Sequence, residues 1–132
     1  MQVFEEPGIA RVHWEASARA IRVEWLSFNP SSSLRKVLAR GLTECQRHHA
    51  VAWIADTRTT RGAMLLEDQE WLAKVGLGAL RQAGLKAVIT VTPSTALAAA
   101  SNRRWQANLT SPEWSVLEVP TLEEALAYCA RL

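Results

Sequence analysis

Residues 51–56 read Val-Ala-Trp-Ile-Ala-Asp, five apolar residues followed by one acidic residue. A short apolar run of this kind is typical of a strand buried on both faces, as at the centre of a parallel sheet. The stretches on either side, 34–45 and 67–80, repeat apolar residues at helical spacing. A buried strand between two amphipathic helices predicts an α/β fold with right-handed crossover connections.

The same alternation of strand and helix continues toward the carboxyl terminus. Residues 85–91 and 115–119 are two further apolar runs, for which we expect strands. Between them, Thr92-Pro93 is typical of a helix start, and the alanine-rich stretch 96–105 predicts a third helix. Residues 121–124 read Thr-Leu-Glu-Glu, which fits a capping box and predicts the start of a last helix.

Toward the amino terminus the apolar residues alternate with a period of two. Residues 11–16 and 19–25 both show this pattern, and the short turn between them predicts an antiparallel hairpin. The first strand of the hairpin is then expected at the edge of the sheet. Asn29-Pro30 ends the hairpin, and the serines of 31–33 offer hydroxyl groups to cap the first helix.

The predicted order is β-β-α-β-α-β-α-β-α, a mixed sheet of about five strands in a single domain spanning 1–132. Because all the parallel crossovers have the same hand, we expect the helices to cover one face of the sheet. The central strands carry apolar side chains on both faces, so the opposite face would expose an apolar patch. Such a patch is typical of a partner surface and favours a homodimer.

Composition excludes several classes of protein. Apolar residues make up 48% of the 132 residues and charged residues 21%, which is typical of a globular domain. A net charge of +2 is too small to predict binding to nucleic acid, and no apolar run is long enough for integral membrane association. The first seven residues lack the basic region of a secretory signal. Cys45 and Cys129 are expected as buried thiols, so we expect a cytoplasmic protein.

Motifs that carry catalysis are missing from the sequence. It contains no Gly-x-Ser-x-Gly elbow, no phosphate-binding loop and no dinucleotide fingerprint. His48 and His49 are adjacent on a predicted helix and point to different sides, and no cluster has zinc spacing. We therefore expect no enzymatic activity, no cofactor and no metal site.

The carboxyl ends of the predicted parallel strands hold the candidate binding residues. Ligands of open α/β sheets lie at this edge, and arginines close to helix N-termini favour an anion. Alternatively, the hydroxyl groups cap helices and Asp56 pairs with Arg58 or with loop amides. The candidates are Asp56, Arg58, Thr59, Thr60, Arg61, Thr92 and Ser94.

Six tryptophans are many for a chain of this length. We expect Trp53 and Trp71 to pack in the core. Trp105 directly follows Arg103 and Arg104, a combination typical of interface hot spots and of sites for anionic or aromatic ligands. These three residues are therefore further candidates for binding a ligand or a partner.

Several short segments, taken with the order of elements, carry a resemblance to a known family. They are Arg22-Val23-Glu24-Trp25, Ala52–Asp56 followed by Thr57-Arg58, Glu67–Leu72, Gly84-Leu85-Lys86 and Glu123-Glu124-Ala125. With these segments the chain resembles the STAS-like family, the fold of bacterial anti-sigma-factor antagonists, and more narrowly small uncharacterised STAS/SEC14-type proteins. The resemblance covers nearly the whole chain and implies a non-enzymatic module for switching or binding.

The resemblance also implies where a phosphorylation switch would lie. Antagonists of this family carry a phosphorylatable serine, followed by glycine, after the third strand. Here that segment, 56–62, reads Asp-Thr-Arg-Thr-Thr-Arg-Gly, without Asp-Ser-Ser-Gly. Thr57, Thr59 and Thr60 are the possible phospho-acceptors in it.

Two functional hypotheses follow. The first is a non-catalytic STAS-like interaction or regulatory module, forming a homodimer or binding another protein through the open sheet face or Trp105. The alternative is a small-ligand binding protein, taking an anion at the strand ends or an apolar molecule in a pocket between helices. A ligand that binds the native state raises the melting temperature, which distinguishes the two.

Overall fold

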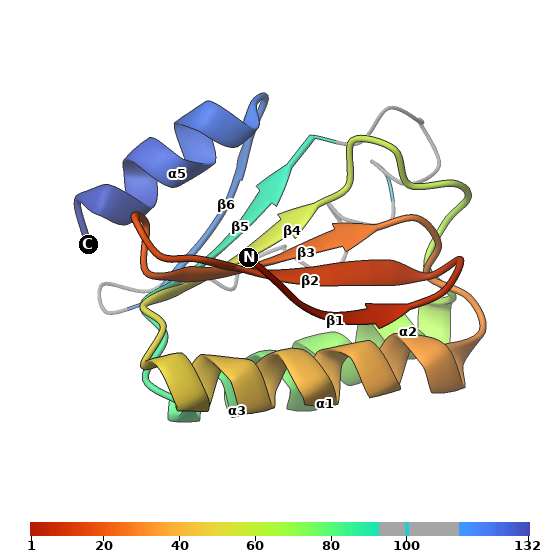
Figure 1. Cartoon of the computed structure of the whole chain (residues 1–132). Helices are drawn as coiled ribbons and strands as arrows, with labels where there is room; N and C mark the ends of the chain where they lie inside the picture. The colour runs from red at the N-terminus through yellow and green to blue at the C-terminus, as the bar shows by residue number, and fades with distance from the viewer. Residues whose placement is uncertain (93–99, 101–113) are drawn as a thin grey trace.

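In the described part of the chain, six strands form one mixed sheet, and their order in space is their order in the sequence (Figure 1). The computed structural model describes residues 1–92, 100 and 114–132. The three amino-terminal strands pair antiparallel and the remaining neighbours pair parallel. The predicted single α/β domain is confirmed, with six strands in place of about five. They are β1 (Gln2–Glu6), β2 (Ala10–Glu15), β3 (Ala20–Trp25), β4 (Ala52–Asp56), β5 (Ala87–Val91) and β6 (Ser115–Val119).

Helices pack on both faces of this sheet (Figure 1). Below it in the figure lie α1 (Ser31–His48) and a second helix, which consists of α2 (Leu66–Trp71), the π-helical turn η1 (Leu72–Gly76) and α3 (Leu77–Gln82). Above it lies α5 (Leu122–Ala130). The helix expected over 96–105 falls outside the described residues. No helix in the described part of the chain combines the length and apolar character needed to cross a bilayer.

The strand β1 was not predicted, and it displaces β2 from the edge of the sheet. Its pairing with β2 shifts register between Gln2 and Phe4, which breaks the alternation of apolar and polar residues. Phe4 lies opposite Val12, while Glu5 lies opposite Arg11 on the other face. The Pro7-Gly8 turn, with Gly8 at a φ of 75°, is the local signal that marks this extra hairpin.

The start of α5 is capped by a local side chain, whereas the serine at the start of α1 makes a contact with another helix. Thr121 caps α5 as predicted, accepting a hydrogen bond from the Glu124 amide at 3.1 Å. The serines of 31–33 do not cap α1, whose N-cap position is Pro30. Ser31 Oγ instead donates to Asp68 Oδ2 of α2 at 2.6 Å, so this hydroxyl ties the two helix starts together.

Two apolar cores lie on opposite faces of the sheet. The larger is packed between the sheet and the helices α1 and α2–α3, and Trp53 is buried in it. The smaller contains Ile54 and Ile89 from the central strands and Ala125 and Cys129 from α5. The expectation that the helices cover only one face is therefore wrong. No crossover fixes the side on which α5 packs, and this helix covers the apolar residues of β4–β6 that would otherwise face water.

The two cysteines occupy different cores, so they are separated by the sheet. Both are free thiols and both are buried, as expected. Burial, aided by the charge of Glu44, raises the pKa of Cys45 to about 12, and burial raises the pKa of Cys129 to about 11. Both side chains therefore act as small apolar residues at neutral pH.

Candidate functional site

An apolar groove of about 330 Å³ runs between α1 and the second helix. Its described walls include three small residues, Ala39 of α1 and Gly76 and Ala79 of the second helix, which leave space between the two helices. One of them, Gly76, ends the π-helical turn, where an added Cβ would lie 2.8 Å from Leu72 Cδ1 and 3.3 Å from the Trp71 ring. The walls are Arg35, Leu38, Ala39, Leu42, Trp71, Val75, Gly76, Ala79 and Leu80.

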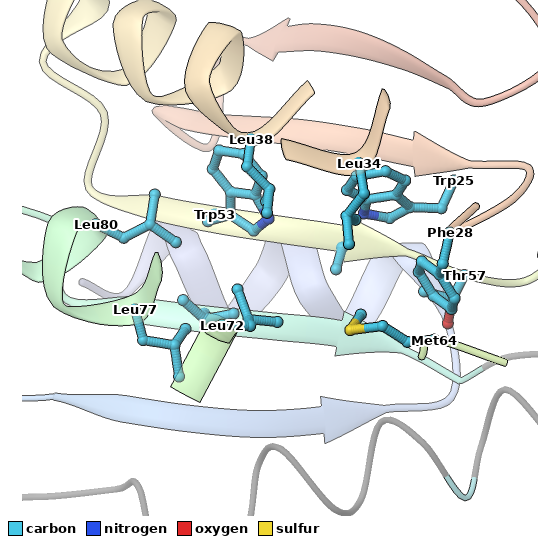
Figure 2. Close-up of a pocket in the computed structure, with 12 residues that line it drawn as sticks. Trp25, Phe28, Leu34, Leu38, Trp53, Thr57, Met64, Leu72, Leu77 and Leu80 are labelled. Atoms are coloured by element: carbon cyan, nitrogen blue, oxygen red, sulfur yellow. The ribbon is translucent and has the colours of Figure 1, made fainter. Parts of the chain in front are cut away.

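A smaller cavity of about 30 Å³ lies between this groove and the sheet. Its walls include Trp25 and Trp53 of the sheet and Leu72 and Leu77 of the second helix (Figure 2). It has room for about one or two water-sized molecules. Leu38 and Leu80 line both the groove and the cavity, so these two side chains form the wall between them.

Arg35 supplies the charge in the groove. Its guanidinium lies 4.7 Å from the centre of the Trp71 ring, a cation–π contact, and Nη2 lies 3.6 Å from Asp68 Oδ1. Asp68 is fully buried, whereas the Arg35 side chain is 46% exposed. Among the described residues, Asp68 Oδ1 has no hydrogen-bond partner. The guanidinium is therefore held over the tryptophan at the side of the groove while still open to solvent.

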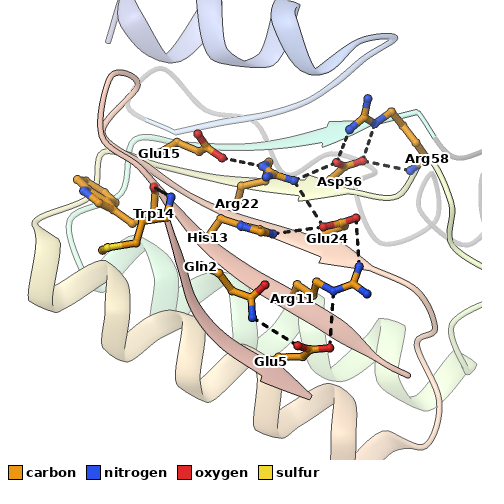
Figure 3. A network of polar contacts seen from close by, with 11 residues as sticks. Gln2, Glu5, Arg11, His13, Trp14, Glu15, Arg22, Glu24, Asp56 and Arg58 are labelled. Carbon is orange, nitrogen blue, oxygen red and sulfur yellow. Dashed lines mark hydrogen bonds and ion pairs between the residues drawn. The ribbon is translucent and has the colours of Figure 1, made fainter. Parts of the chain in front are cut away.

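The predicted strand-end residue Asp56 belongs to a network of charged side chains on the face opposite the groove (Figure 3). Arg58 Nε and Nη2 donate to its two carboxylate oxygens at 2.9 and 2.8 Å, and Arg22 Nη1 donates to Oδ2 at 3.4 Å. The network continues over β3 and β2 to β1 through Glu24 and Arg11. One alternative predicted from the sequence is that Asp56 pairs with Arg58 or with loop amides. The structure shows both contacts, since the Arg58 amide also donates to Asp56 Oδ1, at 3.3 Å.

The geometry around Asp56 favours its ionised form. Burial alone would raise the pKa of this carboxyl group. The hydrogen bonds and charge of Arg58, with the charge of Arg22, outweigh burial and hold the pKa below its usual value. The hydrogen bond to Asp56 in turn raises the pKa of Arg58. The positive charge of Arg58 is thus balanced by the charge of Asp56, so this side chain is a weak binding site for an external anion.

The two arginines of the 56–62 segment do not share a site. Arg58 lines a hollow of about 400 Å³ with Thr121 and Glu123 at the start of α5. Arg61 and Thr59 line another hollow, of about 420 Å³, together with Ser27. The structure therefore divides the predicted anion site at the strand ends into two separate hollows.

The hydroxyl groups of the same segment have internal partners. Thr57 Oγ1 donates to the Val91 carbonyl at 2.6 Å, and Thr60 Oγ1 donates to the Trp25 carbonyl at 2.9 Å. Both threonines are buried, whereas Thr59 is exposed. Phosphorylation of this loop stays a prediction, and Thr59 is the acceptor that a kinase could reach.

The other predicted binding residues are divided between described and undescribed parts of the chain. Thr92 is exposed at the end of β5, and its hydroxyl donates to the Val119 carbonyl at 3.0 Å. Within residues 1–92, 100 and 114–132, no group of three histidine, cysteine or acidic side chains is placed to hold a metal ion. Ser94, Arg103, Arg104 and Trp105 lie outside the described residues.

The sequence leaves a pocket between helices as an alternative, but it does not identify the residues of this groove, because neither of its walls is unusual in the sequence. Arg35 reads as an exposed helix residue, and Trp71 fits the apolar stripe of its helix. The available signal is Gly76-Leu77-Gly78 in the middle of a helix. Glycine is unfavourable there by about 1 kcal/mol, so a mid-helix glycine often marks a close approach of other groups.

Replacing Asp56 by asparagine is expected to lower the free energy of unfolding by about 1–3 kcal/mol, because it removes charge-assisted hydrogen bonds at a buried position. In the parent protein the contribution is complete above the unfolded pKa of about 4 and is lost as the pH falls through the lower folded value. The variant should therefore lose less stability on acidification. Urea unfolding at a series of pH values measures both effects.

The matched control is Glu5→Gln at the exposed end of the same network, where the carboxylate is 41% exposed. An exposed ion pair contributes about 0–1 kcal/mol, so this change should have little effect at any pH. Equal effects of the two substitutions would contradict a special role for Asp56.

Comparisons with protein-family models, with curated proteins and with solved structures find no match to this chain.

Proposed function

We propose that this protein binds a small apolar molecule in the groove between α1 and the second helix. The observation that carries the proposal is a space of about 330 Å³ whose nine described walls include a single charged residue, Arg35. Ligand sites of drug-sized molecules have volumes of about 300–1,000 Å³ and mostly apolar walls with a few polar groups. The groove has both properties.

Exposed apolar side chains at the groove support the same proposal. Val75 is 52% exposed although it lies on a helix that packs against the sheet. Covering such a surface with an apolar ligand is favourable by about 25 cal/mol for each Å² removed from water. The strand-end alternative is less favoured, because Arg58 already has a bidentate partner in Asp56.

The STAS-like regulatory role, with no catalysis, stays a prediction, and ligand binding is compatible with it. Homodimer formation also stays a prediction, although α5 now covers the apolar sheet face on which it was based. The buried thiols agree with the expected cytoplasmic location without establishing it.

The test uses the neutral apolar dye phenylnaphthylamine, whose emission rises in an apolar site. The parent protein should bind the dye with saturation. In Ala39→Phe the phenyl ring should occupy the groove in place of the dye, and because burying such a ring is favourable by about 2 kcal/mol, dye binding should weaken at least about tenfold. Ala39 is exposed on α1, so the substitution should leave the fold intact.

Ala127→Phe is the matched control. This alanine is exposed on α5, across the sheet from the groove, and the substitution adds the same apolar side chain to a helix surface. Binding of the dye should be unchanged in this variant. Absence of saturable binding, or equal effects of the two substitutions, would refute the proposal.

A further inference from the structure

We infer that the occupant of the groove is an elongated amphiphile, a linear alkyl chain with one anionic head group, with the head at Arg35 and the tail directed past Leu38 and Leu80. This inference rests on the proposed function and names its class of ligand. It follows from two features: Arg35 is the one charged residue among the described walls of the groove, and a cavity lies behind Leu38 and Leu80.

The head-group site follows from the geometry of Arg35. The central carbon of the guanidinium lies over the Trp71 ring at 4.7 Å from its centre, and the Asp68 contact at 3.6 Å engages one of its nitrogens. A guanidinium has five N–H donors in a fixed fork, which matches the two oxygens of a carboxylate. Donors therefore remain for a ligand after these internal contacts are made.

Charge complementarity then selects between a neutral and an anionic ligand. The Arg35 side chain is 46% exposed, so any molecule that fills the groove removes part of its hydration. Desolvating a charged group without a new partner is unfavourable, whereas a carboxylate replaces the lost water with hydrogen bonds. An anionic head group is thus favoured over a neutral molecule of the same shape.

The tail site follows from the wall that the groove and the cavity share. Leu38 on α1 and Leu80 on α3 line both spaces, and Figure 2 shows both side chains among those that surround the cavity. Rotation of the leucine side chains would join a groove of about 330 Å³ to a cavity of about 30 Å³, which suits a narrow alkyl chain.

The experiment measures displacement of phenylnaphthylamine by hexanoate, octanoate and decanoate and by the alcohols of the same length. Each added methylene should strengthen binding up to about fourfold while the chain still finds apolar space. Each carboxylate should bind about tenfold more tightly than its alcohol, because a charged hydrogen bond is worth more than a neutral one.

Arg35→Met tests the head-group site, and Arg40→Met is its matched control. Arg40 lies on the same helix over the ring of Phe4 at 5.0 Å, beside the buried Glu44, and outside the groove. Arg35→Met should remove the tenfold preference by weakening carboxylate binding more than alcohol binding, while Arg40→Met should preserve the preference. Arg35→Lys, which keeps the charge for Asp68, should retain part of it.

Leu38→Ala tests the tail site. Opening the shared wall should strengthen binding of decanoate severalfold and that of hexanoate less, since a longer chain extends further past the wall. Leu38→Met, which keeps the side-chain volume but adds flexibility, should act in the same direction with a smaller effect.

Several outcomes would overturn the inference. If the dye binds but carboxylates and alcohols compete equally, or if both arginine variants have the same effect, the anionic class is wrong while the proposed apolar site stands. If no dye binds, the proposed function fails as well. If light scattering shows a dimer that Ala39→Phe dissociates and Ala127→Phe does not, the groove holds a second copy of the chain, which also refutes the amphiphile.

Discussion

Replacing Gly41 by alanine should lower the free energy of unfolding by about 3 kcal/mol, the upper range for forcing extra volume into a packed core. Gly41 is buried on α1, where an added Cβ would overlap Trp53 Cη2 and lie 2.6 Å from Cζ3. Trp53 is 2% exposed in the middle of β4, so its ring cannot turn out into water. Urea unfolding monitored by tryptophan emission measures the loss.

Gly78→Ala is the matched control for this substitution. Gly78 also lies within a helix, but an added Cβ would meet nothing within 4 Å. Alanine should therefore stabilise the protein there by about 0.5–1 kcal/mol through helix propensity alone. In a Trp53→Phe background, whose ring is shorter, Gly41→Ala should cost less. If Gly41→Ala is as well tolerated as Gly78→Ala, Trp53 does not pack against α1 as described.

Replacing Ile89 by alanine should lower the free energy of unfolding by about 2–5 kcal/mol, as expected for a large-to-small change in a closed core. Ile89 is fully buried at the centre of β5, in the smaller core that α5 completes. If α5 did not cover this face, the side chain would already be in contact with water and its loss would cost far less. The midpoint of urea unfolding gives the value.

Leu66→Ala serves as the control for that prediction. Leu66 is 61% exposed at the start of α2, so removing its side chain should change stability by no more than about 0.5 kcal/mol. A cost below about 1 kcal/mol for Ile89→Ala would be typical of an exposed position. Such a result would mean that α5 does not pack on this face.

The parts of the fold that follow from local sequence were predicted well. The hairpin of β2 and β3, the buried strands β4 and β5 and the half-buried strand β6 have periodic or continuous apolar patterns, and Thr121 caps α5 by a contact three residues away. β1 was missed because its apolar residues Val3 and Phe4 are adjacent in the sequence and do not alternate with polar ones. The pairing with β2 accommodates them by a shift of register between Gln2 and Phe4. A period-two pattern cannot survive an irregularity of this kind.

The parts that depend on packing between distant segments could not be predicted in the same way. The handedness of crossovers fixes the side on which α1 and the second helix lie, but it does not constrain α5, which follows the last parallel strand. Its side is set by the apolar residues on the upper face of β4 and β5, such as Ile54 and Ile89. Ser31 likewise reads as a cap until the position of Asp68 is known.

The candidate site shows the same division. The sequence indicated the strand-end residues, and the pairing of Asp56 with Arg58 was among the alternatives considered. The groove depends on which faces of two helices meet, and Arg35 and Trp71 on those faces are 36 positions apart in the sequence. The contact of Arg35 with Trp71, and the place of both residues in the groove, therefore become apparent only when α1 lies beside the second helix.

The strand order of this sheet has a consequence for how the protein is made. Since each strand pairs with its neighbours in the sequence, a chain leaving the ribosome can add every new strand to an edge that is already present. No strand has to wait for a later one to be inserted between it and its predecessor. The antiparallel strands β1–β3, whose contacts are the most local, are suited to form first. On this route the upper face of β4 and β5 stays uncovered until α5 is synthesised, so translation that stops before Thr121 would release a chain with its second core open to water.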